Sequence, residues 1–384
     1  MTVQPQASAP QPIYVGQQFY VPAFEMRLRG AGAPRDVIRD VTQVSFKDSL
    51  TDVDSFDVTI NNWDAAALKF KYSDDTLFDP GTEIELWMGY RDSTLKLMIT
   101  GQIVELRPSF PSAGQPTLVI HGLDLLHELR KQQQSKAWVD QTDTEIARQI
   151  ASNLGIALAP LTPDLLAAEP RNAYLIQDNA YDIVFLLDRA RRIGYDLRVR
   201  ESGTDGSVRG RQLYFAPSTA VKRPTYELIW GKSLVEFQPV LSTAGQVSSV
   251  TVRGWDAVNK QLFQHTATLA DLTTRGLGPQ GGNQALYQSF ADRQEVVATK
   301  IVASRQEAEQ LALETLQIIA KGLVTGTATV VGLPDLRTGN VVMISGIGQR
   351  FDGRYFVTDS THTISDAGYV TQFGFRREEL QGSK

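Results

Sequence analysis

The pattern of apolar and polar residues predicts β-strands at both ends of the chain and helices in its middle. Near the N-terminus, Phe24, Met26 and Leu28 alternate with charged side chains, which is the period of a half-buried strand. Strands of this kind are predicted at residues 24–28, 44–46, 56–60, 84–88, 95–99, 103–106 and 117–120. Because closing or doubling a sheet removes its exposed edges, we expect these strands to form a barrel or a sandwich.

In the middle of the chain the period becomes that of amphipathic helices. Thr142 and Glu145 have the spacing of a capping box, and apolar residues then recur every four positions until Gly155, which can end the helix. A second helix is predicted from an N-cap at Asn179 to Gly194. Its buried stripe is predicted to be Ile183, Leu187, Ala190 and Ile193. A hairpin formed by residues 195–199 and 213–215 completes a small α/β module, and the glutamines at 132–134 are interpreted as a surface connector before it.

Strand-like alternation returns towards the C-terminus. Strands are predicted at residues 226–229, 234–237, 247–252, 325–331, 341–345, 355–364 and 369–375. Residues 266–300 lose this period, and the glycine-rich stretch at 276–284 is interpreted as an extended loop. Ser304 and Glu307 form another candidate capping box, for a helix that ends at Gly322.

The two β-rich ends contain a weak internal repeat. Pro80-Gly81-Thr82 leads through a hairpin to Gly101-Gln102-Ile103, and Thr338-Gly339-Asn340 leads to Gly353-Arg354-Tyr355. Both are a glycine-led strand, a turn and a glycine-led return strand. Because such hairpins are common, chance and a true duplication explain the pattern equally well.

Composition narrows the classes of function. The 384 residues include no cysteine and carry a formal net charge of −5. A disulfide framework, a thiolate metal site and a cysteine nucleophile are therefore excluded, and no basic surface for nucleic-acid phosphates is expected. The N-terminal residues lack the basic and apolar segments of an export signal, and no apolar run approaches ~18 residues. We expect a protein without a membrane span that is made and kept in the cytoplasm.

No residue pattern predicts a catalytic, cofactor-binding or metal site. His121, His127, His265 and His362 lack the spacing of metal ligands, and His362 is interpreted as a hydrogen-bonded structural imidazole. Glycoside hydrolysis needs two carboxylates on facing walls of a cleft. The candidate acids all fall in predicted turns, where aspartate is an ordinary residue; they are Asp52, Asp54, Asp74, Asp75 and Asp335.

Several sequence blocks, in this order and spacing, resemble the late control gene D family, the tail hub proteins of contractile phages that are similar to the hub part of VgrG proteins. In the module the resemblance rests on residues 138–156 and 177–217. Elsewhere the blocks are FDPGTEIELWMGY, ITGQIVEL, LVIHGLDLL, ELIWGKSLVEFQPV, VSSVTVRGWD, EAEQLALETL and the stretch from GLPDLRTGN to FGFRRE. No single block is decisive, since each has the signature of an ordinary strand or helix.

The resemblance implies a mainly β fold with an α+β insertion, made of two tube-like antiparallel β-barrel domains plus a small helical α/β module. The first barrel is expected at residues 13–130, the module at 131–223, and the second barrel at 224–260 and 301–378. The remaining segments are expected to be a flexible N-terminal arm at 1–12, a loop-rich insertion at 261–300 and a C-terminal tail at 379–384.

The resemblance also implies a non-enzymatic baseplate hub that forms a homotrimer and adapts a sixfold tail tube to a threefold spike. Because the chain ends at Lys384 without a β-helical extension, a separate spike protein is expected at the threefold face. A tail tube or tube-initiator protein is expected at the sixfold face, with other baseplate proteins around it and tape-measure protein in the lumen. No cofactor is expected. The location would be the tail baseplate of a virion, or an injection particle, assembled in the host cytoplasm.

Two other classes of function are compatible with a β-rich chain of this composition. A tail-associated cell-wall or polysaccharide hydrolase is the main alternative, and it would depend on one of the acids named above. A secreted adhesin is disfavoured because no export signal is recognised.

Overall fold

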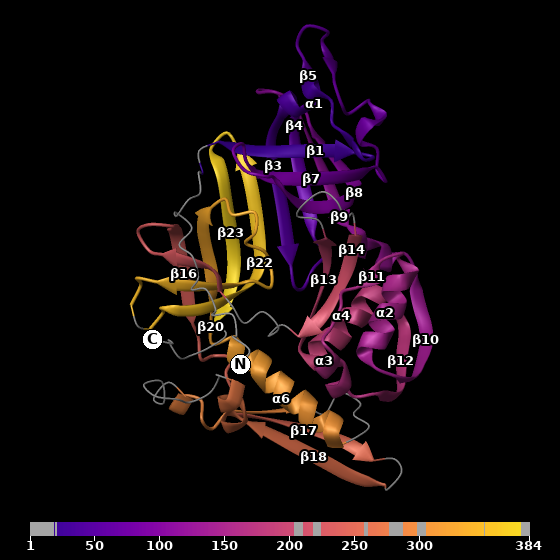
Figure 1. The fold of residues 1–384 in the computed structure, drawn as a ribbon, viewed down its shortest axis with the longest axis vertical. Helices are drawn as coiled ribbons and strands as arrows, with labels where there is room; N and C mark the ends of the chain where they lie inside the picture. The colour runs from indigo at the N-terminus through magenta and orange to yellow at the C-terminus, as the bar shows by residue number, and fades with distance from the viewer. Residues whose placement is uncertain are drawn as a thin grey trace, which may run out of the picture.

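The computed structural model describes residue 19 and residues 21–202, 210–217, 224–256, 260–275, 287–297, 305–348 and 350–377. Its fold is mainly β, as predicted, with an α/β module between two antiparallel β regions (Figure 1). Each of these three parts has its own apolar core. The predicted N-terminal arm, the loop at 276–284, the cap residue Ser304 and the C-terminal tail lie outside the described residues.

The first β region, which we call the first repeat, follows the predicted alternation. Its main strands are β1 (Pro22–Leu28), β3 (Val41–Ser49), β4 (Ser55–Asn61), β7 (Glu83–Tyr90), β8 (Lys96–Ser109) and β9 (Thr117–Asp124). Its shorter elements are β2 (Ala31–Gly32), α1 (Arg35–Asp40), β5 (Trp63–Asp64), β6 (Lys69–Phe70) and η1 (Thr76–Phe78). The main strands pair in the order β3-β4-β9-β8-β7-β1. Most of the predicted inward positions are buried, and Phe46, Phe56 and Ile84 are completely enclosed. Three of them are only half-buried, namely Phe24, Leu95 and Leu97.

The strands predicted at 95–99 and 103–106 are a single long strand, β8, so the predicted break at Gly101 was wrong. Gly101 lies where a Cβ would come within 2.3 Å of the Leu123 carbonyl oxygen, and close approach to β9 is the reason for glycine here. The strand bends instead at a bulge between Ile103 and Glu105. Residues 96–102 pair with β7, and residues 105–109 extend beyond it.

The central module contains the predicted helices and hairpin. Its elements are η2 (Leu125–Arg130), β10 (Gln133–Gln141), α2 (Asp143–Asn153), β11 (Ala157–Leu158), α3 (Pro163–Ala168), β12 (Asn172–Tyr181), α4 (Asp182–Ile193), β13 (Tyr195–Ser202) and β14 (Gly210–Pro217). The capping box is confirmed, since Thr142 Oγ1 accepts from the Glu145 N–H at 3.1 Å and Glu145 Oε2 accepts from the Thr142 N–H at 3.0 Å. Gly155 and Gly194 have the predicted positive φ angles, 73° and 69°.

Two predictions for the module were wrong. The connector predicted around residues 132–134 runs into β10, which pairs with β12 and buries Trp138. Asn179 is not the N-cap of the second helix, because pairing with β10 keeps the backbone extended to Tyr181 and α4 begins at Asp182. In the predicted stripe Ile183 and Ala190 are buried, but Leu187 and Ile193 are only half-buried.

The second β region, which we call the second repeat, consists of strands from both sides of a long insertion. The strands are β15 (Pro224–Ile229), β16 (Leu234–Leu241), β20 (Val324–Val331), β21 (Val341–Ser345), β22 (Gly353–Ser365) and β23 (Gly368–Arg377). On β23 the predicted inward positions Tyr369, Thr371, Phe373 and Phe375 are all buried.

The segment between β16 and β20 differs from the prediction. Residues 247–252 were expected in the second barrel, but β17 (Ser249–Asp256) pairs with β18 (Gln261–Thr268) and β19 (Gln294–Val297) in a separate sheet, with η4 (Leu269–Arg275) beside it. The predicted helix, α6 (Arg305–Lys321), covers this sheet. Val250 and Val252 share an apolar core with Ala308 and Ala312 of α6, which explains why the strand leaves the main sheet.

The two repeats have the same strand order and share individual hydrogen bonds. The second repeat pairs in the order β16-β20-β23-β22-β21-β15, which matches the order β3-β4-β9-β8-β7-β1. The last pair differs in direction, because β15 is parallel to β21 whereas β1 is antiparallel to β7. In each repeat a glycine with positive φ donates its N–H to the return strand, and the return strand donates back one residue later. The residues are Gly81, Ile103 and Thr82 in the first repeat and Gly339, Val357 and Asn340 in the second, with N–O distances of 2.7 to 3.0 Å.

β-Bulges also fall at matching places. The bulge at Ile103/Glu105 on β8 matches one at Val357/Asp359 on β22, and the bulge at Val41/Gln43 on β3 matches one at Leu234/Glu236 on β16. These matches align Ile103 with Val357. The alignment predicted from the glycines, which placed Ile103 opposite Tyr355, was therefore out by two residues.

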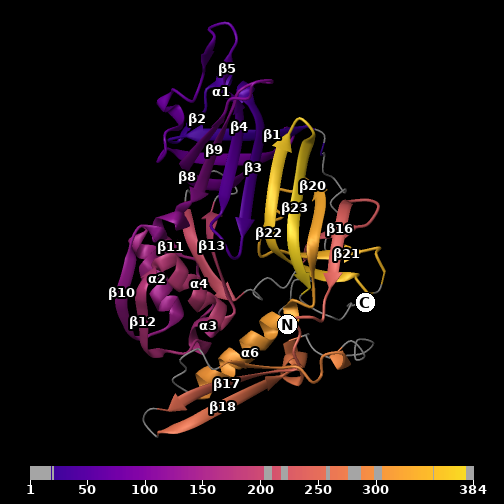
Figure 2. The same ribbon diagram turned by 180° about the vertical axis from the view of Figure 1, so that it is seen from behind.

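The repeats join edge to edge, because β22 pairs with β3 from Asp359↔Ser49 to Ser365↔Gln43. Among the described residues this merges them into one 13-stranded sheet, and Figure 2 shows β3 beside β22 from behind. The module touches both repeats: Arg211 forms an ion pair with Glu83 at 3.0 Å, and Arg198 donates to the Thr338 carbonyl oxygen.

Candidate assembly site

The histidines do not form a catalytic or metal-binding constellation. His121 Nδ1 lies 3.0 Å from Asp57 Oδ1 on the neighbouring strand, His127 Nδ1 contacts the Asp124 carbonyl oxygen at 2.6 Å, and His265 lies on β18. Within the described ranges, no group of three or more histidine and acidic side chains is placed to hold a metal.

The acids singled out in the sequence are dispersed over turns and one buried position. Asp52, Asp74, Asp75 and Asp335 lie in bends or turns, as predicted. Asp75 caps η1 by accepting from the Leu77 N–H at 2.8 Å. Asp54 is the exception because it is buried, and its carboxyl accepts from the Ser49 N–H at 3.1 Å. The structure brings no pair of these acids together across a cleft.

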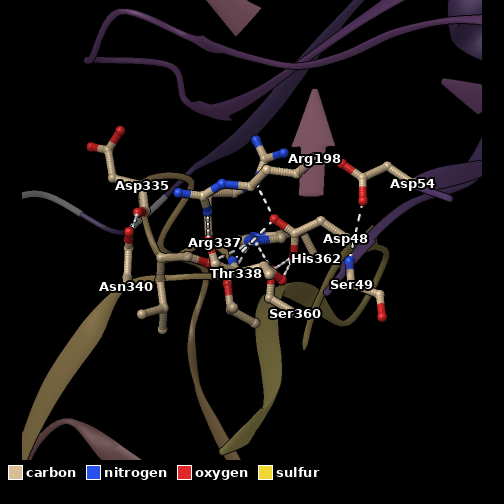
Figure 3. Close-up of polar contacts among 12 residues, drawn as sticks. Asp48, Ser49, Asp54, Arg198, Asp335, Arg337, Thr338, Asn340, Ser360 and His362 are labelled. Carbon is tan, nitrogen blue, oxygen red and sulfur yellow. Dashed lines mark hydrogen bonds and ion pairs between the residues drawn. The ribbon is translucent and has the colours of Figure 1, made fainter. Parts of the chain in front are cut away.

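A buried polar cluster lies where the repeats join, and we call Asp48, Arg337, Thr338, Ser360 and His362 the interrepeat joint (Figure 3). Asp48 is the last residue but one of β3, and it accepts from the Arg337 Nε at 2.6 Å and from the Thr338 N–H at 3.1 Å. Its other oxygen accepts from Thr338 Oγ1 at 2.9 Å and from Ser360 Oγ. Among the described residues, every hydrogen bond to this carboxylate comes from the second repeat, so Asp48 fastens the first repeat to it.

His362 is held in one tautomer by the same joint. Its Nε2 lies 3.1 Å from the Leu336 carbonyl oxygen, which can only accept, so Nε2 carries the proton. Nδ1 then accepts from Tyr369 Oη at 3.0 Å or Thr371 Oγ1 at 3.1 Å. The imidazole is fully enclosed, which confirms the structural role predicted for it.

Burial sets the charges of the joint. Burial lowers the pKa of His362 to about 3, so the ring is neutral at pH 7. Burial alone would raise the pKa of Asp48, but Arg337 and the Ser360 hydrogen bond hold it below the usual value. Burial, with the nearby charges of Asp124 and Asp48, raises the pKa of Asp54 well above its usual range. At neutral pH the joint therefore contains one carboxylate, one guanidinium and a neutral histidine.

Asp48, His362 and Ser360 are the residue types of a hydrolase triad, but their environment excludes that role. Ser360 and His362 have no exposed surface and Asp48 is 4% exposed, so no substrate can reach them. The joint is structural. The sequence contained a signal for it that the interpretation missed, because Asp48 continues the buried alternation of Val44 and Phe46 and therefore had to face the core.

Several strands of the merged sheet have an unpaired edge, including the end strands β2 and β15. Two of these edges match the strands that join the repeats, and we call them the free edges. Among the described residues, β16 pairs with β20 and, at Leu234 alone, with Trp230, and residues 105–109 of β8 pair only with β9. Prolines lie on both edges, at Pro108 and Pro239. The Ser242 N–H donates to the Leu323 carbonyl oxygen beside β20, so the nitrogen of Pro239, three residues earlier, faces the free edge.

Both free edges carry apolar side chains that are not fully covered. Phe110 is 55% exposed, and on β16 Val235 is 66% and Val240 57% exposed. Half-buried apolar residues continue these edges; they are Leu106, Phe237 and Leu241. Exposed strand edges with apolar residues are sites where another strand can add.

The same fold occurs in solved structures of tail proteins. The 43 kDa tail protein of prophage MuSo2 from Shewanella oneidensis is 16% identical, with a TM-score of 0.68, and the match covers 94% of this chain and 100% of that one. The tail protein from Neisseria meningitidis MC58 is 15% identical, with a TM-score of 0.66 and coverage of 94% and 98%. The E. coli c3393 protein is described as a component of the type VI secretion system, similar in structure to the T4 tail proteins gp27 and gp5. It is 12% identical, with a TM-score of 0.52 and coverage of 94% and 79%.

The fold thus defines the class: this chain has the architecture of phage tail and type VI secretion proteins, as the resemblance implied. Residues 23–366 match the family model described as the Alg8 N-terminal domain, and the chain belongs to that family. No curated protein matches the sequence. Membership of the late control gene D family stays a prediction.

In the part of the chain that the structure describes, no helix combines the length and the apolar composition needed to cross a membrane.

Proposed function

We propose that this protein is a structural hub at the end of a contractile phage tail or a related injection machine. Three copies close into a ring that contains six β repeats. One side of the ring presents six similar surfaces to a tail tube or tube-initiator protein, and the other presents a threefold face to a separate spike protein. Other baseplate proteins bind around the ring, and catalysis is not part of this role.

The duplicated strand order is the observation that carries the proposal. A protein between sixfold and threefold partners needs two equivalent surfaces per chain when three chains assemble. The matching strands, bulges and glycine turns of the two repeats provide this equivalence. Closed cyclic symmetry is the common way for identical chains to cover such surfaces. The fold of the tail proteins named above supports the same role.

The solvent-facing side of the merged sheet has the chemistry expected of a tube lumen. Its residues alternate with the core positions, and most of them are uncharged and polar; they include Gln43, Ser45, Ser55, Thr59, Thr325, Thr327, Thr361, Thr363 and Gln372. The charged residues on the same face include Lys47, Asp57, Arg107 and Arg376, and Arg107 forms an ion pair with Asp57. A wall of this kind does not bind phosphates strongly, because nucleic-acid affinity depends on lysine and arginine. Tape-measure protein or DNA can then pass through the ring without adhering.

Native mass spectrometry of the full chain tests the proposal. We expect a species of three copies, and with its spike partner three hubs to three spikes. A chain that stays monomeric at every concentration and with its partners, or that forms a stable hexamer alone, would contradict the ring. A zymogram on peptidoglycan and capsule tests the hydrolase alternative, and a clearing that disappears on mutation of one acid would favour it instead.

A further inference from the structure

We infer that the ring closes through the two free edges, with residues 105–111 of one copy adding to β16 of the next copy as an antiparallel strand. This inference rests on the proposed ring and specifies its interface. The eight strands from β16 to β8 alternate in direction along the merged sheet, because every neighbouring pair between them is antiparallel. β8 of one copy and β16 of the next are therefore antiparallel when they are placed side by side.

The internal duplication gives the register. β8 matches β22 and β16 matches β3, so the pairing between copies should repeat the β22–β3 pairing already present within the chain. The matched bulges align β8 with β22 and β16 with β3 residue by residue. Replacing each residue of the β22–β3 pairing by its equivalent gives the expected partners between copies. They are Leu106 with Leu241, Arg107 with Val240, Pro108 with Pro239, Ser109 with Gln238, and Phe110 with Phe237 of the next copy.

The side chains on these edges complement one another. On the core-facing side the pairing brings together Leu106, Pro108 and Phe110 with Phe237, Pro239 and Leu241. Six apolar side chains, none of them fully covered in the isolated chain, would then share one interface, and removing apolar surface from water is the main driving force of association. No charge needs to be desolvated on this side.

The prolines make the edge specific. Pro239 offers no N–H to an approaching strand, and in the inferred register it faces Pro108, which also lacks one. A strand with ordinary residues opposite Pro239 would leave its own carbonyl oxygen without a donor. The inferred register places the two defects against each other, while the pairs Leu106/Leu241 and Phe110/Phe237 keep their hydrogen bonds.

Engineered disulfides test the register directly, because the chain has no cysteine of its own. Arg107→Cys with Val240→Cys places one cysteine on each free edge. The same-chain pair Thr361↔Lys47 occupies the equivalent positions within the molecule, so Thr361→Cys with Lys47→Cys is the matched control. After mild oxidation we expect the Arg107/Val240 variant to run as a covalent three-chain species on a non-reducing gel. The Thr361/Lys47 variant should form its disulfide within one chain. Arg107→Cys with Glu236→Cys, four residues out of register, should stay unlinked.

The outcomes separate the interface from the proposed function. If native mass spectrometry shows three copies and the Thr361/Lys47 control oxidises, but Arg107/Val240 does not link chains, the ring stands and this interface is wrong. If every variant and the unmodified chain remain monomeric, the proposed ring itself fails.

Phe110→Lys gives a second readout that does not depend on disulfide chemistry. The side chain is already 55% exposed, so the fold should persist with an unchanged circular dichroism spectrum. The dissociation constant of the three-copy species should rise at least about tenfold, and an unchanged constant would overturn the inference.

Discussion

The two repeats share strand order and bulges, but they place large and small side chains in opposite positions. In the first repeat the ring of Phe56 on β4 lies over Gly122 on β9, where a Cβ would come within 2.1 Å of the ring. In the second repeat the glycine is Gly326, on the strand that matches β4, and the ring is Phe375, on the strand that matches β9. Backbone pairing and the combined volume of each cross-strand pair are thus retained, while the individual residues are exchanged.

The edges of the repeats differ as well. Within the chain, β22 and β3 meet around the buried carboxylate of Asp48, which the second repeat surrounds with donors. The matching position on β16 is Leu241, at a free edge. If a charged residue stood on a free edge, it would be exposed to water before assembly and buried afterwards. Each association would then have to desolvate that charge, and the free-energy cost can exceed the attraction gained. A joint that forms once, during folding, can contain a buried ion pair more easily than an edge that must find another copy.

The largest effect on stability is expected from removing the carboxylate of Asp48, which β3 has and the matching strand β16 lacks. Asp48→Ala removes the carboxylate that accepts from the buried hydroxyls of Thr338 and Ser360 and from Nε of the partly buried Arg337. Breaking a buried ion pair from one side costs roughly 3–5 kcal/mol. Leu241→Ala, the matched change at the free edge, should cost about 1 kcal/mol or less because the side chain is only half-buried. Unfolding in guanidinium chloride gives the loss of stability of each variant. Equal losses would show that the ion pair and hydrogen bonds of Asp48 add nothing to the stability of the interrepeat joint.

The next effect is a pH dependence of stability that comes from His362 in the second repeat. The pKa of His362 is lowered by burial to about 3 in the folded chain, below the value of 6.5 expected when unfolded. Between these values the unfolded chain binds one more proton, so stability should fall by about 1.4 kcal/mol for each pH unit below 6.5. This contribution is fully present above pH 6.5.

Other groups around His362 must be separated from it. Asp54, whose pKa is raised, works in the opposite direction over part of this range, because its folded form keeps a proton that the unfolded form loses above pH 3.8. Asp48, whose pKa is lowered, contributes only as the pH falls through 3.8 and below. The contributions of Asp54 and Asp48 cancel when the free energy of unfolding of the unchanged chain is compared with that of His362→Gln at pH 7, 6, 5 and 4. The loss of stability below pH 6.5 that we assign to His362 should disappear in His362→Gln and persist in His265→Gln. If the unchanged chain and His362→Gln gave parallel curves of stability against pH, His362 would not be the source.

The comparison also shows why part of the fold could be read from the sequence. Strands with one buried face were found by alternation, as at Phe56, Val58 and Ile60, and the α2 cap followed from Thr142 and Glu145. Strand β10 was missed because its residues are mostly exposed and polar, so that pairing with β12, rather than a local pattern, determines its conformation. Strand β17 was found, but its membership of a separate sheet depends on α6, far along the chain.

The assembly site was harder to predict for a related reason. The turn glycines Gly81 and Gly339 indicated a repeat, but its true register depends on bulges that leave no local sequence mark. Asp48 alone did not indicate an ion pair, because its partners Arg337, Thr338 and Ser360 lie 289 to 312 positions further along the chain. Free edges are likewise a property of topology, which only the assembled sheet reveals.

The smallest expected effect is the coupling free energy between the phenylalanine ring and the glycine that faces it. It tests whether the large side chain on one strand compensates for the missing side chain on the other. Gly122→Ala puts a methyl group against Phe56 and should cost roughly 1–3 kcal/mol by overpacking. Phe56→Leu should cost about 1.5 kcal/mol or less on its own. Because the smaller side chain makes room for the methyl group, the double variant should lose less than the sum of the two by about 1 kcal/mol.

The second repeat offers the mirror of this cycle. A Cβ on Gly326 would lie 2.1 Å from the Gln238 carbonyl oxygen and 2.8 Å from the Phe375 ring. Phe375→Leu can relieve only the contact with the ring, so Gly326→Ala with Phe375→Leu should show coupling of the same sign but smaller size. Gly122→Ala with Phe375→Leu joins residues from different repeats and should be additive within about 0.5 kcal/mol. Urea unfolding of the single and double variants gives the three coupling energies. If the Gly122/Phe56 and Gly326/Phe375 cycles were both additive, the ring and the glycine of each pair would act independently. The similar combined volumes of the two pairs would then not reflect compensation.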